Sequence, residues 1–435
     1  MTSSPCCYGR EAKMRYPSTS LIEQIKRERK RKGITQTELA AMLGLPQPSI
    51  ARIETGVISP TLGMLERICD ALGLEMLVQK QRVIPRRVDL VVDMRGCPNR
   101  CLHCWLGDLP NRILNDKDAE WIASLFRPYF KDLTFYSWLR EPDFCPDYRA
   151  RWEKDCALSS IKPERFELAS FYRLVRDPDY VVFLKEVGTK KVQLTFFGGE
   201  TTTDKYVGRK GAYQELLEAT RILLKQGITP RWQLFINMEN KEEILPQIKV
   251  GEGMGVKEIF VHEGSCDGNN AKLYDIRIEK EAIPEELIPY YLDYGGIRAE
   301  REWCQTLKGS KESFLPHNEK DIILNIASDY NVYFHFTSPS HAWCLGNLKK
   351  DPMDRIVKAA VEETVPALVL SRAMPLGRLA SKYGDFESNK AFGLEDYKMF
   401  LLNRYLDEAY NVPKDSDGLS ARIQKMLGDS ATKAA

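Results

Sequence analysis

The amino-acid sequence predicts an α/β fold, a partial parallel barrel, preceded by a small all-α domain. The barrel is predicted by β-branched runs that end at glycines or polar residues and that alternate with helical segments from residue 188 onward. The all-α domain is predicted by four or five short, well-punctuated helices within residues 21–77. A chain of 435 residues with 43% hydrophobic and 29% charged residues has room for two or three such domains.

The expected domain borders follow from these patterns. We expect a disordered tail over residues 1–18, the helical domain over 19–80, the barrel over 85–340 with an insertion at about 105–170, and a helical extension over 341–435. No apolar run approaches the ~20 residues that span a bilayer, and the N-terminus lacks the apolar core of a secretory signal. We therefore expect a cytoplasmic protein without a membrane partner, whose eleven cysteines are metal ligands or thiols rather than a disulfide framework.

The N-terminal segment is basic and carries helix boundaries. Residues 1–82 contain 13 Lys and Arg against 8 Asp and Glu, whereas the whole chain has a net charge of only +2. Thr35 and Glu38 form a capping-box pattern, and Gly44 is expected to end that helix. A second helix is expected to begin at Pro46 after a short turn, which is the helix-turn-helix arrangement.

The string T-Q-x-x-L-A-x-x-x-G-x-x-Q-x-x-I-x-x-x-E-x-G at residues 35–56 resembles the Cro and lambda-repressor type of DNA-binding domain. The resemblance implies that the helix from Pro46 enters the major groove of duplex DNA, with Gln47 and Ser49 near base edges and Gln36 and Arg52 on phosphates. Such domains read paired half-sites, so a homodimer is expected. The alternative is that the same fold docks a protein, with its Lys- and Arg-rich first helix merely solvated.

The stretch "GCPNRCLHC" places three cysteines, Cys97, Cys101 and Cys104, on a loop after the strand-like run "RRVDLVVDM". The spacing C-x3-C-x2-C offers three thiolates to an iron-sulfur cluster and leaves one iron without a protein ligand. Zinc sites more often pair C-x2-C units, and a thioredoxin-like motif needs only two cysteines, so both fit this loop less well.

"CPNRCLHC" resembles the signature of the radical SAM superfamily, with Cys97, Cys101 and Cys104 in the three ligand positions. The resemblance implies a (β/α)6 barrel, a 4Fe-4S cluster and S-adenosylmethionine (SAM), which the open iron binds. It also implies cleavage of SAM to a 5′-deoxyadenosyl radical and an electron donor such as a flavodoxin or ferredoxin. His103 occupies a position where the family often has a ring that shields the cluster.

A second signal is "VQLTFFGGETTTD", a strand-like run that ends in Gly198, Gly199 and Glu200. It resembles the family's Gly-Gly-Glu motif, which ends the second barrel strand and contacts the SAM amino group, although Thr201 replaces the usual proline. Glu141, which precedes Pro142 after another strand-like run, is a rival for that carboxylate. We favour Glu200 because the chain around it follows the family's order of elements.

Later strand ends supply further candidates. By the family's layout, Asn237 and Glu239 after one strand, and His262 and Glu263 after the next, approach the SAM ribose and the substrate. A further barrel strand is expected at "NVYFHFTS". The segment "HAWCLGNLKKDPMDRI" resembles SPASM-type extensions but lacks their C-x2-C pairs, so Cys266, Cys304 and Cys344 are expected to be small apolar residues rather than ligands of an auxiliary cluster.

The leading hypothesis is thus a cytoplasmic radical SAM enzyme fused to a DNA-binding domain. Its substrate is unknown, and the SPASM-like tail alone favours a peptide. The alternative from another class is a transcription regulator that senses its cluster and SAM without turnover.

Overall fold

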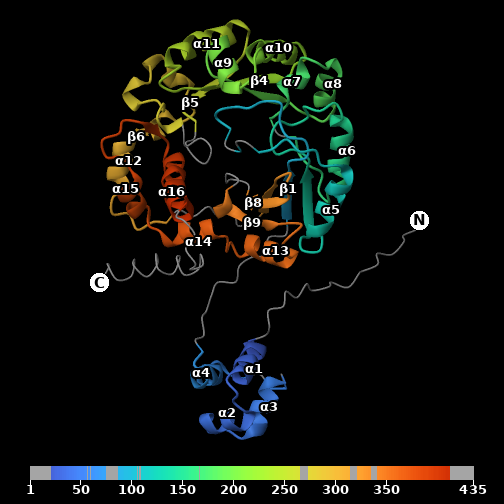
Figure 1. Ribbon diagram of the computed structural model, residues 1–435, viewed down its shortest axis with the longest axis vertical. Coiled ribbons are helices and arrows are strands. Elements are labelled where there is room, and N and C mark those ends of the chain that lie inside the picture. Colours follow the sequence, from blue (N-terminus) through green and yellow to red (C-terminus); the bar gives the residue numbers. More distant parts are fainter. Residues whose placement is uncertain are drawn as a thin grey trace, which may run out of the picture. The chain divides into compact units, whose positions relative to one another are not determined.

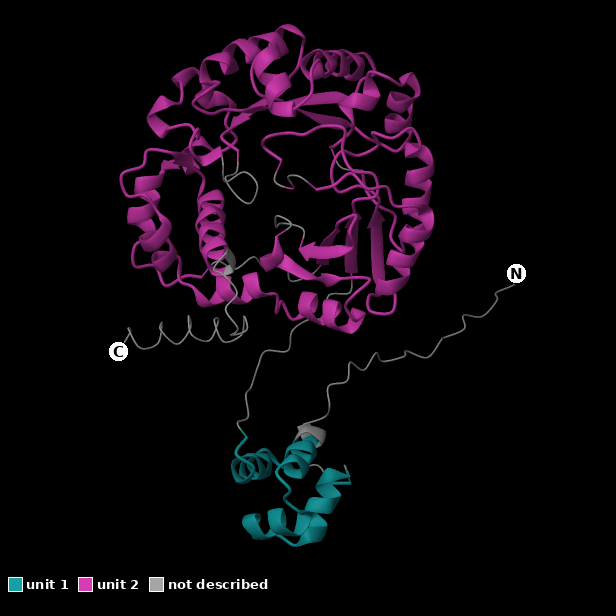
Figure 2. Ribbon diagram, viewed as in Figure 1, with its two compact units in different colours: residues 1–82 teal, residues 83–435 magenta. Residues whose placement is uncertain are grey.

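The computed structural model of this chain describes residues 21–55, 57–58, 60–74, 87–104, 106, 109–165, 167–264, 273–313, 321–334 and 340–411. The chain divides into two compact units, residues 1–82 and residues 83–435 (Figure 2). The tail predicted over residues 1–18 and Cys266 lie outside the described residues. None of the described helices is long and apolar enough to cross a membrane.

The described part of the first unit is all helical, as predicted. Thr35 caps its second helix in a complete capping box with Glu38, and Gly44 ends that helix at a φ of 66°. The helices pack around a core that includes Ile25, Leu39 and Ile50. Their bounds are α1 (Leu21–Arg31), α2 (Gln36–Leu43), α3 (Gln47–Glu54) and α4 (Leu62–Ala71).

A buried ion pair joins the first and third helices of this unit. The Arg29 Nε and Nη2 atoms donate to the two carboxylate oxygens of Glu54 at 2.6 and 2.8 Å, and the two side chains are only 8% and 2% exposed. Arg29 also donates to the Ile34 carbonyl. The fork of the guanidinium thereby ties α1 to both α3 and the turn before α2.

The described part of the second unit contains two separate sheets and a short ribbon. The first sheet has the order β2-β1-β7-β8-β9, and the second has the order β3-β4-β5 with all strands parallel. The ribbon pairs β6 with β10. The bounds are β1 (Arg87–Val92), β2 (Asp132–Tyr136), β3 (Lys191–Phe196), β4 (Thr229–Phe235), β5 (Glu258–His262), β6 (Arg298–Ala299), β7 (Asp321–Ile326), β8 (Asn331–Phe334), β9 (Cys344–Asn347) and β10 (Ala391–Phe392).

Helices cover the outer faces of these sheets, and α10 and α11 lie outside the β3-β4-β5 sheet (Figure 1). The alternation of strand and helix from residue 188 onward is therefore confirmed, and α13 to α16 lie in the described part of the predicted C-terminal extension. The bounds are α5 (Asp116–Phe126), α6 (Tyr148–Leu158), α7 (Phe171–Leu174), α8 (Pro178–Glu186), α9 (Glu200–Val207), α10 (Ala212–Lys225), α11 (Lys241–Gly253), α12 (Glu300–Leu307), α13 (Met353–Val361), α14 (Pro366–Ala373), α15 (Leu376–Tyr383) and α16 (Leu394–Asn411).

The predicted strand at "NVYFHFTS" is not a parallel barrel strand. Its described part, β8, runs antiparallel to β7, and β9 then runs antiparallel to β8. Only a few residues separate β7 from β8, which is enough for a hairpin but far short of a parallel crossover. The strand parallel to β1 on this side is β7, which the sequence analysis overlooked.

The expected insertion contributes a strand to the sheet. β2 pairs with β1 in parallel register, whereas the strand that ends in Gly-Gly-Glu, β3, pairs with β4 in the other sheet. The resemblance implied that the Gly-Gly-Glu motif ends the second strand. In the structure it ends the third described strand along the chain, β3. The predicted border at residue 341 falls within the second unit, because β9 continues the sheet that contains β1.

We predict that Arg29→Met lowers the stability of the first unit by about 3 kcal/mol, because the Glu54 carboxylate is left buried without its partner. Hydrogen exchange of the amides of α2 and α3 in the full chain measures this loss. The matched control is Arg31→Met, since Arg31 is 71% exposed and pairs with the neighbouring Glu28 on the same helix. A change of less than about 0.5 kcal/mol is expected there. Equal losses in both variants would contradict a special role for the buried pair.

Candidate functional site

The cysteine loop follows the carboxyl end of β1, and both backbone groups of its first cysteine are hydrogen-bonded. The side chain of Asn111 accepts a hydrogen bond from the Cys97 amide at 3.2 Å and donates one to the Cys97 carbonyl at 2.9 Å. Gly96 has a φ of 80°, and a Cβ added there would lie 2.4 Å from the Asn111 Oδ1. Only glycine fits this position, because both the backbone conformation and the close approach exclude a side chain.

The middle of the loop is bound to the end of α9. The Arg100 and Leu102 amides donate to the Val207 and Tyr206 carbonyls at 3.0 and 2.8 Å. Gly208, which ends α9, has a φ of 72° and lies so close that an added Cβ would be 2.7 Å from the Arg100 carbonyl oxygen. The structure therefore brings the cysteine motif and the Gly-Gly-Glu helix, about 100 residues apart in the chain, into direct contact.

The three loop thiols are half-buried and free. Burial raises the pKa of Cys97 to about 12, helped by the charge of Glu141, and raises the pKa of Cys101 still further. The Asn99 amide donates a hydrogen bond to the Cys97 sulfur at 3.4 Å. Within the described residues, no group of three or more His, Cys, Asp or Glu converges on the position of one metal ion. A cubane cluster does not require such convergence, because each thiolate binds a different iron.

His103 belongs to an aromatic cluster at the ends of the β3-β4-β5 sheet. Its ring centroid lies 4.7 Å from that of Phe197 and 4.6 Å from that of Phe235. Burial, helped by nearby His262, lowers the pKa of His103 to about 3, so the ring is neutral at physiological pH. Its Nδ1 is buried and has no hydrogen-bond partner in the described part of the chain.

His262, at the end of β5, extends the same cluster. Its ring lies 4.2 Å from that of Phe235, and its Nδ1 accepts a hydrogen bond from the Gly264 amide at 2.9 Å. Burial lowers its pKa to about 4. The following residue, Glu263, forms an ion pair with the buried Arg277 at 3.6 Å. Of the two residues predicted at this strand end, His262 thus joins the His103 cluster, and Glu263 faces a buried cation.

The Gly-Gly pair is held by a residue that the sequence analysis missed, Glu243 in the first turn of α11. The Gly199 amide and the Thr202 hydroxyl donate to its two carboxylate oxygens at 2.8 and 2.7 Å. Gly198 has a φ of 127°, and a Cβ there would lie 2.5 Å from Glu243. Acidic residues are common in first turns, so nothing in the sequence distinguished Glu243 from its neighbours.

Glu200 and Asn237 have different surroundings. Glu200 is exposed at the start of α9, and its carboxylate accepts a hydrogen bond from the Gln214 side chain at 3.1 Å. Asn237 is buried, donates to the Tyr206 hydroxyl at 2.8 Å and accepts from the Glu239 and Asn240 amides. The Asn237 side chain therefore shapes the turn after β4 and orients Tyr206 beside the cysteine loop.

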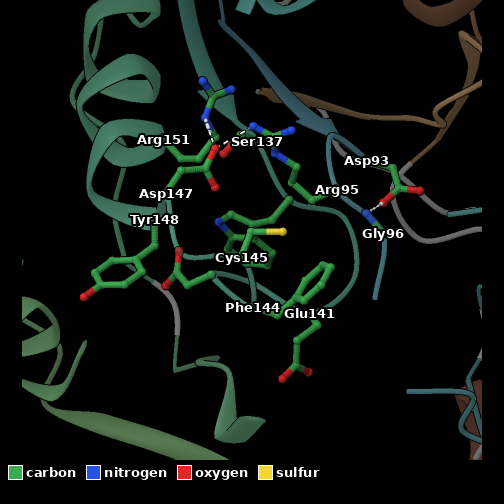
Figure 3. Close-up of a pocket in the computed structure, with 12 residues that line it drawn as sticks. Asp93, Arg95, Gly96, Ser137, Glu141, Phe144, Cys145, Asp147, Tyr148 and Arg151 are labelled. Carbon is green, nitrogen blue, oxygen red and sulfur yellow. Dashed lines mark hydrogen bonds and ion pairs between the residues drawn. The ribbon is translucent and has the colours of Figure 1, made fainter. Parts of the chain in front are cut away.

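Glu141, the rival carboxylate, lies in a small pocket beside the start of the cysteine loop (Figure 3). Burial raises its pKa to about 7, against the opposing effects of Ser170 and Arg209. Its Oε1 is buried without a hydrogen-bond partner among the described residues. Asp93 and Gly96 line the same pocket, so Glu141 is close to the cysteine motif although its strand lies in the predicted insertion.

In the first unit, the predicted DNA-contacting residues gather on the helix-turn-helix. The Gln47 side chain donates to the Gln36 Oε1 at 2.9 Å, and the Gln36 side chain donates to Glu54 at 2.8 Å. Ser49 is half-buried and Arg52 is exposed on α3. The buried Glu54 thus anchors a chain of two amides that ends at the first residue of α3.

Comparison with known families agrees with both resemblances. Residues 25–78 match the helix-turn-helix family model, and residues 91–239 match the model of the radical SAM superfamily. The chain therefore carries a helix-turn-helix domain followed by a radical SAM domain. The second match spans both the cysteine loop and the Gly-Gly-Glu motif.

Individual relatives are more distant. An uncharacterized HTH-type transcriptional regulator, y4dL, of Sinorhizobium fredii is 33% identical over 72 residues, or 17% of this chain and 37% of that protein. This chain thus spans little more than a third of that relative. Among solved structures, native anSMEcpe with bound AdoMet has a TM-score of 0.42 at 15% identity, over 75% of this chain and all of that one. Streptococcus suis SuiB bound to precursor peptide SuiA has a TM-score of 0.39 at 12% identity, over 77% and 82%.

We predict that Gly96→Ala displaces the cysteine loop and raises the alkylation rate of Cys97 several-fold, because the new Cβ would overlap Asn111. Iodoacetamide labelling followed by peptide mass spectrometry measures the rate. Gly227→Ala is the matched control, because Gly227 has a similar φ of 74° but nothing within 4 Å of an added Cβ. We expect it to cost about 1–2 kcal/mol of stability without changing the labelling of Cys97. Similar labelling in both variants would show that strain alone explains the effect.

Proposed function

We propose that this chain, whose residues 91–239 match the radical SAM superfamily and whose residues 25–78 form a helix-turn-helix domain, is a DNA-binding radical SAM enzyme. One observation carries the proposal: the loop with Cys97, Cys101 and Cys104 is clamped by backbone hydrogen bonds to the helix that follows Gly-Gly-Glu. Two motifs that the family uses on one cofactor are thereby held together in this chain.

The residues of the loop suit a 4Fe-4S cluster. Its three thiols are free and half-buried, and no aspartate, glutamate or fourth cysteine lies between them in the chain. Burial disfavours the ionised thiols unless a cation is bound, whereas a thiol that coordinates a metal ion is deprotonated outright. Cys97, Cys101 and Cys104 would therefore hold the cluster.

A cluster held by these three cysteines would supply the reductive cleavage of SAM to a 5′-deoxyadenosyl radical, which would then abstract hydrogen from a substrate. The chain's own contribution is position and exclusion of water. The neutral ring of His103, a residue of the loop, packs against Phe197 and Phe235 and so holds this part of the loop in apolar surroundings. Asn111 and Gly208 keep the loop in place.

For SAM itself, we propose that Gly198, Gly199 and Glu200 contact its amino group. The support is the family motif, the close backbone approach that the two glycines permit, and the anchoring of Gly199 by Glu243. Asn237 would act from a distance by orienting Tyr206. Glu200 is exposed, and its carboxylate accepts a hydrogen bond from the Gln214 side chain.

The partners follow from the two domains. We propose that duplex DNA binds α3, with Gln47 and Ser49 toward the bases and Gln36 and Arg52 toward phosphates, and that two copies of the chain read paired half-sites. A flavodoxin or ferredoxin in the cytoplasm would supply the electron. The substrate is proposed to be a peptide, on the SPASM-like sequence at residues 341–356.

A second candidate function is a regulator that senses its cluster and SAM without turnover. The observation that favours it is the helix-turn-helix domain, in which Gln47 and Gln36 are held by hydrogen bonds in series to Glu54. An enzyme without a regulatory role would not need such a domain. The two functions differ in one product: only the enzyme releases 5′-deoxyadenosine.

We predict that the anaerobically reconstituted full chain, given SAM and dithionite, forms 5′-deoxyadenosine, and that Cys101→Ala abolishes both this product and most of the bound iron. Chromatography of the nucleoside and an iron assay provide the two readouts. The matched control is Cys156→Ala, since Cys156 is a half-buried free thiol on α6 outside the loop. A wild-type chain that binds iron and SAM but never forms the nucleoside would instead favour the sensor.

We predict that Arg52→Ala weakens binding to all duplex sequences alike and lowers the slope of log affinity against log salt by about 1, because one phosphate contact is lost. Gln47→Ala should instead reduce the preference for DNA from upstream of the protein's own gene over unrelated duplex DNA. Fluorescence anisotropy at several salt concentrations measures both effects. The control is Arg355→Ala, which removes a 73% exposed arginine from the second unit. Salt-independent binding of the wild-type chain would contradict the DNA-binding proposal.

A further inference from the structure

The cysteine loop reaches the surface of the second unit beside an exposed segment, residues 111–113. The Asn111 side chain bonds both backbone groups of Cys97, at 3.2 and 2.9 Å, so the two residues that follow it lie close to the first cysteine. These two residues, Arg112 and Ile113, are exposed, and Ile113 is 72% exposed although it is large and apolar. The segment therefore offers a cation and an apolar side chain to a partner at the edge of the loop.

A second segment with cations borders the loop after α9. The Arg209 Nε donates to the Asn99 Oδ1 at 3.0 Å, and a Cβ added at Gly208 would lie 3.0 Å from the Arg100 Cβ. Lys210 follows directly and is exposed. Two consecutive basic residues are thus held against the middle of the cysteine loop.

Arg100 connects the two segments from within the loop. Its Nη1 donates to the Cys97 carbonyl at 3.2 Å and to the Asn99 carbonyl at 3.0 Å, and the residue is exposed. Asn111 bonds the same Cys97 carbonyl, and Arg209 bonds the Asn99 side chain. The basic residues therefore form one continuous surface around the first part of the loop, which we call the loop rim: Arg100, Arg112, Ile113, Arg209 and Lys210.

The charge of the loop rim is poorly neutralised and differs in sign from that of its unit. Within the described part of the chain, Arg100, Arg112 and Lys210 pair with no carboxylate, and Glu215 divides its charge between Arg209 and Arg176. Residues 1–82 hold a charge of +5 in a chain whose net charge is +2, which leaves −3 for residues 83–435. A positive surface on a negatively charged unit favours an acidic partner that approaches at this place.

We propose that the loop rim docks an acidic one-electron carrier protein that reduces the cluster held by the three loop cysteines, an inference that rests on the proposed function. One electron leaves the reduced carrier, which is thereby oxidised, and enters the cluster, and no bond forms or breaks. The carrier must come close to the cysteines, and the loop rim surrounds the exposed part of their loop. Electron-transfer partners form small interfaces, so a few cations around one apolar residue are sufficient. Duplex DNA, the other polyanion proposed to bind this chain, would gain nothing from the exposed Ile113.

The test measures the affinity of a dye-labelled, oxidised acidic flavodoxin for the reconstituted full chain by fluorescence anisotropy at several salt concentrations. Arg112→Glu combined with Lys210→Glu reverses two rim charges. We expect this rim variant to bind about tenfold more weakly at low salt and almost equally at high salt, because salt screens exposed charges. Ile113→Ser should weaken binding several-fold at every salt concentration, because an apolar contact is not screened.

The matched control is Arg355→Glu combined with Lys358→Glu, which reverses two cations on α13 that are 73% and 68% exposed. This control makes the same change in total charge and should bind flavodoxin as the wild-type chain does. Excess dithionite should reduce the cluster fully in every variant, as electron paramagnetic resonance would report, whereas reduced flavodoxin should reduce the rim variant more slowly at low salt.

Several outcomes would overturn the inference. They are a wild-type chain that does not bind the flavodoxin, a rim variant that binds it as the wild type does, and an equal loss in the α13 control. Weaker binding of DNA but not of flavodoxin would assign the loop rim to nucleic acid, and loss of the cluster from the rim variant would assign it to the fold of the loop. A wild-type chain that takes up no cluster, or that forms no 5′-deoxyadenosine with dithionite, overturns the proposed function instead.

Discussion

Two backbone hydrogen bonds, from Arg100 to Val207 and from Leu102 to Tyr206, determine where the cysteine motif lies. The described residues of that loop form no helix or strand of their own, so its position depends on outside partners. Gly208 permits the contact, because any side chain there would overlap the Arg100 carbonyl. The contact joins the loop after β1, in one sheet, to α9, the helix after β3 in the other sheet. The candidate site therefore depends on both sheets.

The electrostatic character of that junction follows from burial. Burial raises the pKa of Cys97 to about 12, well above that of a free thiol, so the site strongly disfavours its ionised form. Burial likewise keeps His103 and His262 neutral. A site that disfavours charge on its own ligands requires a strong cation to ionise them, which is what an iron cluster provides. The same scarcity of water makes each remaining charge, Glu141 and Arg209 above all, effective over a longer range.

In the helix-turn-helix unit, a buried ion pair holds surface side chains in place. Long amide side chains lose rotamer freedom when they bind a ligand, so ordering the proposed DNA-reading residues beforehand would lower that cost. The buried pair of Arg29 and Glu54 lies beneath them, and Gln36 and Gln47 are bonded in series to the Glu54 carboxylate. One buried ion pair therefore serves both the fold of the unit and the orientation of its proposed DNA-reading side chains.

The sequence by itself determined whatever depends on neighbours in the chain. It identified the capping box at Thr35, the cysteine triplet and the Gly-Gly-Glu turn, because spacing and backbone freedom are local properties. Only the tertiary structure decided which strand lies beside β1, because pairing of parallel strands depends on packing between distant segments. For the same reason, it alone brought the Glu243 carboxylate to the Gly199 amide and Glu141 into the pocket that Gly96 also lines, since a carboxylate acquires its role from what surrounds it.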